Sequence, residues 1–348
     1  MPALKHRLKT ALTGAWARLA CHTPLGRIVD ARTERRLLIL YGHCVEDPDL
    51  NGELHADMKI GAAQLGGILK ALGARFDLVT ISEGMNRLRS GERGRSMVAL
   101  SMDDGYRDNL LRLVPILETT GAKATIFLEA GAVANRRLPW LHAFGWLDAE
   151  LGTELLAKKL AVVLPETRNA LLECRNSNRL KRILKYDAER GARDRGLADL
   201  LDEHGGDARG MVDRLYLSVE EAQRLAAFGS IEIGGHTVDH PVLSRLSKAE
   251  QQAQISGGAK GIRLALGVEA TGAVLAFPYG RAWDYDDASK EAAKEAGYTY
   301  AVTTHDGVNR RGTDPFALKR VPIHGDTRLH HLVAEATGCL DLFRRAKR

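Results

Sequence analysis

Two short motifs of acidic and metal-ligating residues stand far apart in this chain of 348 residues. The first, D-D-G-Y at 103–106, has two adjacent carboxylates, and the second, H-T-V-D-H-P at 236–241, has two histidines four residues apart. Two neighbouring ionised carboxylates are costly to bury, unless one of them binds a divalent cation and the other stays free as a proton acceptor. If the second motif turns helically, its two imidazoles share one face and can hold one Zn²⁺.

The two motifs together favour hydrolysis. Two histidines and one carboxylate leave open coordination positions, which suits hydrolysis on zinc or oxidation on iron. The spare carboxylate favours hydrolysis, because a metal-activated water needs a base beside it. Each motif alone also has a purely structural interpretation, since Asp-Gly is a common turn and a pair of histidines often binds no metal.

Two further motifs supply candidate polar groups. F-P-Y-G-R at 277–281 has a proline and a glycine around a tight loop, which can aim a backbone N–H at a developing oxyanion, or can simply end a strand. K-R-V-P-I-H-G-D at 319–326 places His324 after an apolar segment. His324 is a candidate general acid for a leaving amine, and the alternative is a histidine in a surface loop.

Apolar runs that alternate with helical patterns must position these motifs. Buried strands are predicted at 36–41, 76–81, 96–102, 123–128, 231–233, 273–277, 300–303 and 317–321. Helices are predicted at 58–73, 109–119, 247–266 and 286–296. This order predicts a parallel sheet with helical crossovers, and the number of repeats favours a barrel. In such a barrel, chemistry lies at the carboxyl ends of the strands, where the motifs stand.

The stretch 136–215 breaks this rhythm, because it is rich in helix formers and carries a basic segment at 175–195. It is predicted to be a helical insertion whose basic face is solvated, or else forms a cationic lid or docking surface for an anionic substrate or lipid head group. The predicted organisation is a basic N-terminal helical segment (1–36), the first part of a barrel (37–135), the insertion (136–215), the second part of the barrel (216–330) and a basic tail (331–348).

Composition narrows the class of protein. The net charge is +6, and no run of about 18 apolar residues predicts a membrane span. Aromatic residues make up only 5% of the chain, so stacking platforms for nucleic acid are poorly supplied. Four distant cysteines without a C-x-x-C pair argue against a disulfide framework and a zinc knot. With no signal peptide predicted, we expect a cytoplasmic protein, or one whose basic N-terminal helix contacts the inner face of a membrane.

The motifs D-D-G-Y, H-T-x-x-H-P and F-P-Y-G, in this order, resemble those of the polysaccharide deacetylases of the NodB-homology type, carbohydrate esterase family 4. The resemblance covers residues 37–326 apart from the insertion. It implies an α/β fold, a distorted (β/α) barrel, and a divalent metal ion that is most often Zn²⁺. By motif position it implies Asp104, His236 and His240 as metal ligands, Asp103 as general base, and the Tyr279 backbone N–H as an oxyanion donor.

The sequence departs from the family pattern at three places. Many relatives carry an arginine two residues before the proline of the third motif, where this chain has Ala276. Arg320, rather than Arg281, is therefore expected to orient Asp103. A glycine separates Tyr41 from His43, so His43 receives no role. His324 lies in a less leucine-rich segment than in relatives.

The implied activity is hydrolysis of N-acetyl groups on amino sugars of a polysaccharide or of its lipid-linked precursor, in exopolysaccharide or cell-envelope glycan biosynthesis. Asp103 would take a proton from water, and His324 would protonate the departing amine. We assign substrate contacts to Tyr106, Pro278, Tyr279 and Trp283, and expect no nucleic-acid partner.

Two alternatives remain for the activity. One is an amide hydrolase or deformylase of the same superfamily that acts on a small molecule or lipid-linked sugar. The other is a catalytically silent glycan-binding protein, although all four motif acids and histidines are intact. The oligomeric state is left open.

Overall fold

Eight short parallel strands form the main sheet of this computed structural model, which describes residues 13–32, 34–91, 93–267 and 273–340. The strand order is β10-β1-β5-β6-β7-β8-β9, and β4 also pairs with β5. The strands are β1 Leu37–Gly42, β4 Asp77–Val79, β5 Met97–Met102, β6 Ala124–Leu128, β7 Ile231–Gly235, β8 Val274–Ala276, β9 Tyr300–Val302 and β10 Val321–Pro322. Strands β2 Cys44–Val45 and β3 Lys59–Ile60 form a separate pair.

The apolar runs form strands because both faces of the sheet are buried. In β1, Leu37 and Ile39 lie in one core cluster, and Leu38 and Leu40 lie in another. The first cluster also collects side chains from β5, β6, β8 and β9, so it fills the inside of the curved sheet. The second lies between the sheet and its outer helices. Continuous apolar sequence is what a parallel strand covered on both faces requires.

The sheet curls into a barrel that the segment before β10 completes. Leu318 forms a parallel bridge to Val302 of β9, and Val321 pairs with Leu40 of β1. The chain 318–322 therefore connects the two ends of the strand order. The predicted (β/α) barrel is confirmed, although the strand predicted at 317–321 is shorter and lies at Val321–Pro322.

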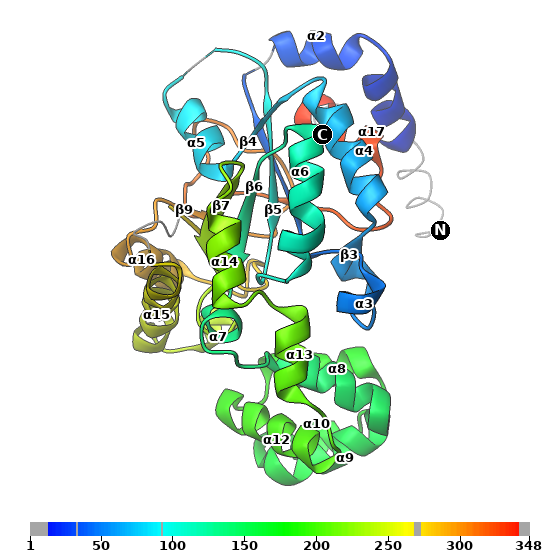
Figure 1. Cartoon of the computed structure of the whole chain (residues 1–348), viewed down its shortest axis with the longest axis vertical. Coiled ribbons are helices and arrows are strands. Elements are labelled where there is room, and N and C mark those ends of the chain that lie inside the picture. The colour runs from blue at the N-terminus through cyan, green and yellow to red at the C-terminus, as the bar shows by residue number, and fades with distance from the viewer. Residues whose placement is uncertain (1–12, 33, 92, 268–272, 341–348) are drawn as a thin grey trace.

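Helices cover the outside of the sheet and gather at one end of the molecule (Figure 1). Those of the barrel part are α2 Leu25–Arg32, α3 Pro48–Asn51, α4 Ala62–Gly73, α5 Ile81–Arg89, α6 Val114–Thr120, α7 Ala130–Val133, α14 Val219–Ala226, α15 Lys248–Leu266, α16 Asp287–Glu295 and α17 Leu329–Ala336. The helices between α7 and α14 are α8 Trp140–Leu151, α9 Thr153–Val163, α10 Arg168–Leu172, α11 Ser177–Tyr186, α12 Arg190–Glu203 and α13 Ala208–Leu215.

Two predicted helices differ from the observed ones. The pattern at 58–73 contains a short helical turn and β3 before α4 begins at Ala62. The pattern at 109–119 begins as a π-helix, Asn109–Leu113, and continues as α6. Pro115, which has no backbone N–H to donate, lies where the π-helix passes into α6.

Helices α8–α12 bury a core of their own. Leu147, Leu156, Leu160 and Leu197 are among its fully buried members. In Figure 1 these helices, drawn in green, lie together at the lower end of the molecule. We keep 136–215 as the proposed limits of the insertion.

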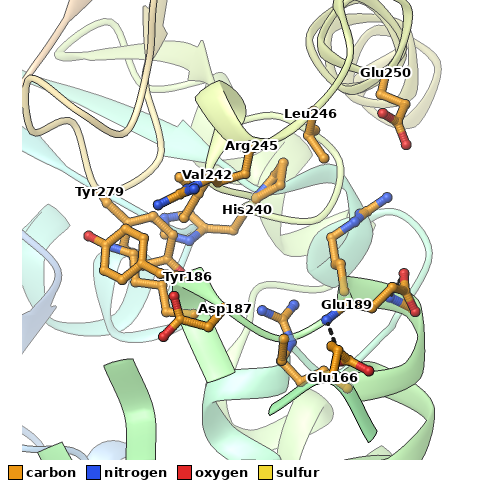
Figure 2. Close-up of a pocket in the computed structure, with 16 residues that line it drawn as sticks. Glu166, Tyr186, Asp187, Glu189, His240, Val242, Arg245, Leu246, Glu250 and Tyr279 are labelled. Atoms are coloured by element: carbon orange, nitrogen blue, oxygen red, sulfur yellow. Dashed lines mark hydrogen bonds between the residues drawn. The ribbon is translucent and has the colours of Figure 1, made fainter. Parts of the chain in front are cut away.

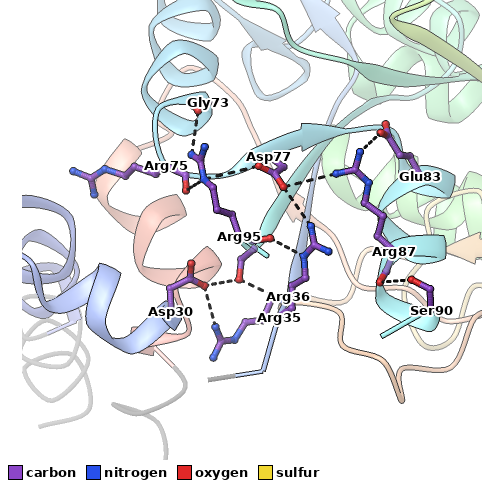
Figure 3. Close-up of polar contacts among 11 residues, drawn as sticks. Asp30, Arg35, Arg36, Gly73, Arg75, Asp77, Glu83, Arg87, Ser90 and Arg95 are labelled. Atoms are coloured by element: carbon purple, nitrogen blue, oxygen red, sulfur yellow. Dashed lines mark hydrogen bonds and ion pairs between the residues drawn. The ribbon is translucent and has the colours of Figure 1, made fainter. Parts of the chain in front are cut away.

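The amino ends of the strands carry a polar network rather than a candidate site (Figure 3). The Asp77 carboxylate lies 3.3 Å from a guanidinium nitrogen of Arg35, 3.7 Å from one of Arg87 and 3.9 Å from one of Arg95. The Arg36 guanidinium donates to the carbonyl of Thr337 at 3.1 Å, which ties β1 to the C-terminal helix.

The chain termini are described only in part. Residues 1–12 of the predicted N-terminal segment and residues 341–348 of the predicted basic tail lie outside the described residues. None of the described helices has both the length and the hydropathy needed to cross a bilayer. All four cysteines are buried and free.

Candidate active site

The motifs meet at the carboxyl ends of neighbouring strands. Asp103 directly follows β5, His236 directly follows β7, and the F-P-Y-G motif directly follows β8. Gly42 pairs with Met102 and Gly235 with Leu275, so these strands end at nearly the same level. The parallel register therefore brings together residues that are far apart in the sequence.

Asp104, His236 and His240 form a compact group of potential metal ligands. Their ligand atoms all lie within 4.8 Å of one another. Oδ1 of Asp104 lies 3.3 Å from Nε2 of His236 and 3.7 Å from Nε2 of His240. The ligands of a tetrahedral zinc ion, each bound at about 2.0–2.1 Å, are separated by similar distances. Oδ1 of Asp104 is buried and makes no well-aligned hydrogen bond within the described residues, so the group fits a divalent cation.

A turn with left-handed backbone, rather than a helix, brings the two histidines together. The predicted helical turn is wrong, because residues 236–240 form a loop after β7 in which Thr237 has φ +65° and His240 has φ +49°. Asp104 and Tyr279 are also left-handed, with φ +76° and +60°. Such conformations cost free energy in residues other than glycine and cluster at functional sites. Four of the five found in the described residues lie in this site.

The tautomer of His236 is fixed by the backbone. Its Nδ1 lies 2.8 Å from the carbonyl oxygen of Ala276, which can only accept a hydrogen bond. Nδ1 therefore carries the proton, and Nε2 presents its lone pair toward Asp104 when the ring is neutral. Ala276 thus contributes through its main chain.

Burial and charge set the protonation of the potential ligands. Burial, helped by the charge of His236, lowers the pKa of His240 to about 3, which keeps its imidazole neutral. Burial alone would raise the pKa of Asp104, but its contact with His236 and the charge of His240 hold that pKa well below its usual range. Burial alone would lower the pKa of His236, but the contact with Asp104 raises it.

Asp103 is held by a bidentate ion pair with Arg320. The two guanidinium nitrogens donate to Oδ1 at 2.7 Å and to Oδ2 at 2.9 Å. Arg320 is fully buried and also donates to the carbonyl of Thr303 at 2.9 Å, so its position is fixed. Burial alone would raise the pKa of Asp103, but the charge of Arg320 outweighs it and lowers the pKa. Arg320 thus contacts Asp103 directly, whereas Arg281 is exposed, and the orienting role of Arg320 stays a prediction.

The loop after β8 presents a free backbone donor. Within the described residues, the N–H of Tyr279 donates no hydrogen bond, whereas its carbonyl accepts one from the hydroxyl of Thr304 at 2.9 Å. The Tyr279 ring packs edge-on against His240, with 4.5 Å between ring centroids. An unpaired N–H next to the ligand cluster is available to a developing oxyanion.

The other predicted site residues lie in different surroundings. Tyr106 is buried, its ring stacks on Tyr216, and its hydroxyl lies 3.1 Å from Nε2 of His142. This placement does not support the substrate contact predicted for Tyr106. Pro278 is also buried, whereas Trp283 is 61% exposed and its indole N–H donates to the Tyr186 hydroxyl at 3.1 Å.

His324 is half-buried on the loop after β10. Its Nδ1 accepts a hydrogen bond from the backbone N–H of Asp326 at 3.3 Å. Within the described residues, it makes no hydrogen bond or ion pair with Asp103 or with the ligand cluster. Its acid role stays a prediction.

Sequence reasoning missed Glu129 and gave no role to His43. Glu129 directly follows β6, is only 4% exposed, and burial and the charge of Asp104 raise its pKa well above the usual value. The rule that located the other motifs, a polar residue at the carboxyl end of a strand, also identifies Glu129. The charge of His43 acts on both Asp103 and Asp104.

The insertion also reaches the site, through contacts that the sequence analysis did not specify. Nζ of Lys185, on α11, lies 3.3 Å from the centroid of the Tyr279 ring. The hydroxyl of Tyr186 donates to the buried carboxylate of Asp284 at 2.9 Å, and Lys185 approaches the same carboxylate at 3.5 Å. Burial, opposed by the charge of Asp284, lowers the pKa of Lys185 to about 8.

Comparisons with known proteins agree with this geometry. A family model described as polysaccharide deacetylase matches residues 176–301, which include the histidine motif and the loop after β8. The Bacillus subtilis (strain 168) protein named "Putative polysaccharide deacetylase YxkH" is 31% identical over 108 residues. That match covers 31% of this chain and 37% of the relative.

Solved structures share the fold at low sequence identity. The Streptococcus pyogenes deacetylase PplD, in complex with acetate, is 17% identical, with a TM-score of 0.56 over 87% of this chain and 99% of that one. IcaB from Ammonifex degensii is also 17% identical, with a TM-score of 0.56 over 87% of this chain and 97% of that one. By its family-model match, its curated relative and its shared barrel, this chain is similar to the polysaccharide deacetylases.

Proposed function

We propose that this protein is a metal-dependent hydrolase that removes N-acetyl groups from amino sugars. The observation that carries the proposal is the side-by-side arrangement of a ligand group, Asp104, His236 and His240, and a second carboxylate, Asp103, held by Arg320. When bound, a divalent cation supplies Lewis-acid activation of the amide carbonyl and of water. Zn²⁺ is the proposed ion, because two imidazoles and one carboxylate suit it.

The chain's own residues handle the protons and the developing charge. Asp103 accepts a proton from the attacking water, and its two hydrogen bonds from Arg320 keep the carboxylate ionised and oriented. The Tyr279 N–H donates to the oxygen that becomes negative as the water oxygen bonds to the carbonyl carbon. The C–N bond then breaks, and the amine takes a proton, which we assign to His324. The products are acetate and a free amino sugar.

The substrate class is proposed as an N-acetylated glycan or its lipid-linked precursor in exopolysaccharide or cell-envelope glycan biosynthesis. The acetate in the PplD structure is the product that such a reaction releases. A lipid-linked substrate would require contact with a membrane surface, for which the basic N-terminal segment is the proposed element.

Acetate release tests the proposal. Purified protein is assayed on chitooligosaccharides and on a lipid-linked N-acetyl sugar, before chelation, after chelation and after Zn²⁺ is restored. We expect release that chelator abolishes and Zn²⁺ restores, with about one metal ion per chain in the wild type and a large loss of metal in Asp104→Asn. Metal-loaded protein that binds these glycans without releasing acetate would instead support the silent glycan-binding alternative.

A further inference from the structure

A cavity of about 460 Å³ lies between the candidate site and the insertion (Figure 2). One wall consists of residues 240–242, 245, 246 and 250 together with Tyr279. The other wall consists of Glu166 and of residues 185–191 and 193, from α11, α12 and the turn between them. His240 and Tyr279 line both this cavity and the candidate metal site, so the cavity opens directly beside the reaction centre. Asp103 does not line it.

The charged groups in the lining balance one another. The cations are Lys185, Arg190, Arg193 and Arg245, and the carboxylates are Glu166, Asp187, Glu189 and Glu250. Most of them already have partners within the protein. The cavity therefore has no surplus of cations, in contrast to the basic character of the insertion's sequence.

Specific contacts account for six of these eight groups. Lys185 lies 3.5 Å from Asp284, Arg190 lies 3.3 Å from Asp239, and Arg193 lies 2.7 Å from Asp194. The three glutamates accept backbone N–H groups at or near the starts of helices: Glu166 from Glu189, Glu189 from Gly191 and Ala192, and Glu250 from Ser247. These six groups shape the cavity, but each of them already interacts with another group of the protein.

The two remaining groups stand on opposite walls. Asp187, at the C-terminal end of α11, and Arg245, on the loop after the histidine motif, are both exposed. Neither side chain makes a hydrogen bond or ion pair with any other residue that the structure describes. A free carboxylate and a free guanidinium can bind the hydroxyls of an uncharged sugar, and the ring of Tyr186 in the same lining can pack against its apolar face.

We propose that this cavity binds the uncharged sugar residue next to the N-acetyl sugar that is hydrolysed, with Asp187 and Arg245 as its specificity-determining residues. The proposal rests on the proposed deacetylase function and adds the substrate class, a neutral glycan chain rather than a diphosphate-linked sugar. The lining supports this choice, because a diphosphate would require several unpaired cations, whereas Arg245 is the one unpaired cation among the described lining residues and Asp187 adds a free negative charge. The insertion is then a substrate-binding element.

Binding to chain-length variants of the ligand tests the proposal. Asp103→Asn, which should bind without turnover, is the background, and affinities for N-acetylglucosamine and for its β-1,4-linked trimer are measured by NMR titration. Asp187→Asn and Arg245→Gln should each weaken trimer binding about tenfold, the loss of a hydrogen bond from a charged group, and leave binding of the single sugar unchanged. UDP-N-acetylglucosamine should bind no tighter than the single sugar.

Two exposed residues outside the lining provide matched controls. Asp199→Asn on α12 and Arg182→Gln on α11 remove the same charges and should not alter either affinity. Equal weakening of both ligands, unchanged trimer affinity in Asp187→Asn and Arg245→Gln, or preferential binding of the diphosphate sugar would each overturn the proposal. Failure of the deacetylase function itself would appear separately, as absence of acetate release from the metal-loaded wild type, while the binding experiment remains valid.

Discussion

At the scale of residues, the two adjacent aspartates have different surroundings. Asp104 faces two imidazoles, and Asp103 faces a buried guanidinium, so both can stay ionised side by side. The sequence predicted this division through family motifs, and predicted Arg320 because Ala276 occupies the position where relatives carry arginine. It could not place His324, because a loop residue's direction depends on local contacts such as the one from Asp326.

Arg320→Lys tests whether the bidentate pair orients Asp103. Lysine keeps the charge but donates from a single nitrogen, so we expect kcat to fall about 10²-fold while the metal content stays unchanged. Because the carboxylate loses stabilisation, its pKa should rise, and the acid limb of the kcat/KM profile should move to higher pH. Steady-state kinetics across pH and metal analysis measure both effects.

Arg281→Lys is the control for this prediction. Arg281 belongs to the same loop as Tyr279, but it is exposed and its guanidinium lies near Trp283 rather than Asp103. Its replacement should leave the pH profile unchanged. A shift of the acid limb in Arg281→Lys but not in Arg320→Lys would show that Arg320 is not the residue that orients Asp103.

At the scale of elements, helix α15 sets the position of the histidine loop. Gly258 of α15 packs so closely that a Cβ would lie 2.7–2.9 Å from backbone atoms of Thr237. A pattern of helix formers predicted α15 itself, but sequence spacing does not report how near a helix lies to a loop. For the same reason, the left-handed turn at Thr237 and His240 could not be predicted.

Gly258→Ala should displace the histidine loop. A methyl group meeting backbone atoms cannot be relieved by a side-chain rotation, so we expect weaker metal binding and a loss of stability of about 1–3 kcal/mol. Gly67→Ala on α4 is the matched control, because nothing lies within 4 Å of its Cβ. That variant should be stabilised by about 0.5–1 kcal/mol with metal affinity unchanged. Equal behaviour of the two variants in metal titration and thermal unfolding would contradict the packing argument.

Glu83 links α5 to β6 through charge. Its carboxylate lies 2.6 Å from a guanidinium nitrogen of Arg87 and 2.9 Å from Nζ of Lys123. Partial burial alone would raise the pKa of Glu83, but the hydrogen bond and charge of Lys123, with the charge of Arg87, lower it. A lowered folded-state pKa means that the stabilisation is complete above the unfolded-state pKa and is lost as pH falls through the folded-state value.

Glu83→Gln should therefore destabilise the protein most at neutral pH. We expect a loss of about 1 kcal/mol at pH 7 that shrinks progressively below about pH 4.5, where the wild-type carboxylate also loses its charge. Urea unfolding of both proteins over this range measures the difference. Glu118→Gln, at an exposed position of α6, is the control and should show no such trend. If Glu83→Gln lost the same free energy of unfolding at every pH, the lowered pKa of Glu83 would not contribute to stability.

At the scale of the whole molecule, a barrel that carries the candidate site is joined to a helical unit that lines the cavity beside that site. The barrel could be predicted because strands buried on both faces leave continuous apolar runs in the sequence. The contacts of Lys185 and Tyr186 with the loop after β8 could not, because they depend on tertiary packing of α11 against the barrel.

Because α8–α12 bury a separate core, a cavity in that core should promote local unfolding of the insertion while the barrel stays folded. Leu160→Ala, at a fully buried position of α9, should cost about 2–5 kcal/mol locally. Hydrogen exchange should accelerate in α8–α12 while β1, β5 and β6 keep their protection. Leu100→Ala in β5 is the comparison, and it should accelerate exchange throughout the barrel. Uniform acceleration by Leu160→Ala would mean that the chain unfolds as one unit.

The rate of acetate release by metal-loaded Asp103→Asn, compared with the metal-loaded wild type, tests the central claim most directly. The substitution keeps the shape of the side chain and leaves Asp104, His236 and His240 in place, so the variant should still bind one metal ion. Removal of the proton acceptor should lower kcat by about 10²–10⁴-fold. Metal-loaded Asp103→Asn that releases acetate at the wild-type rate would contradict the division of labour between the two aspartates.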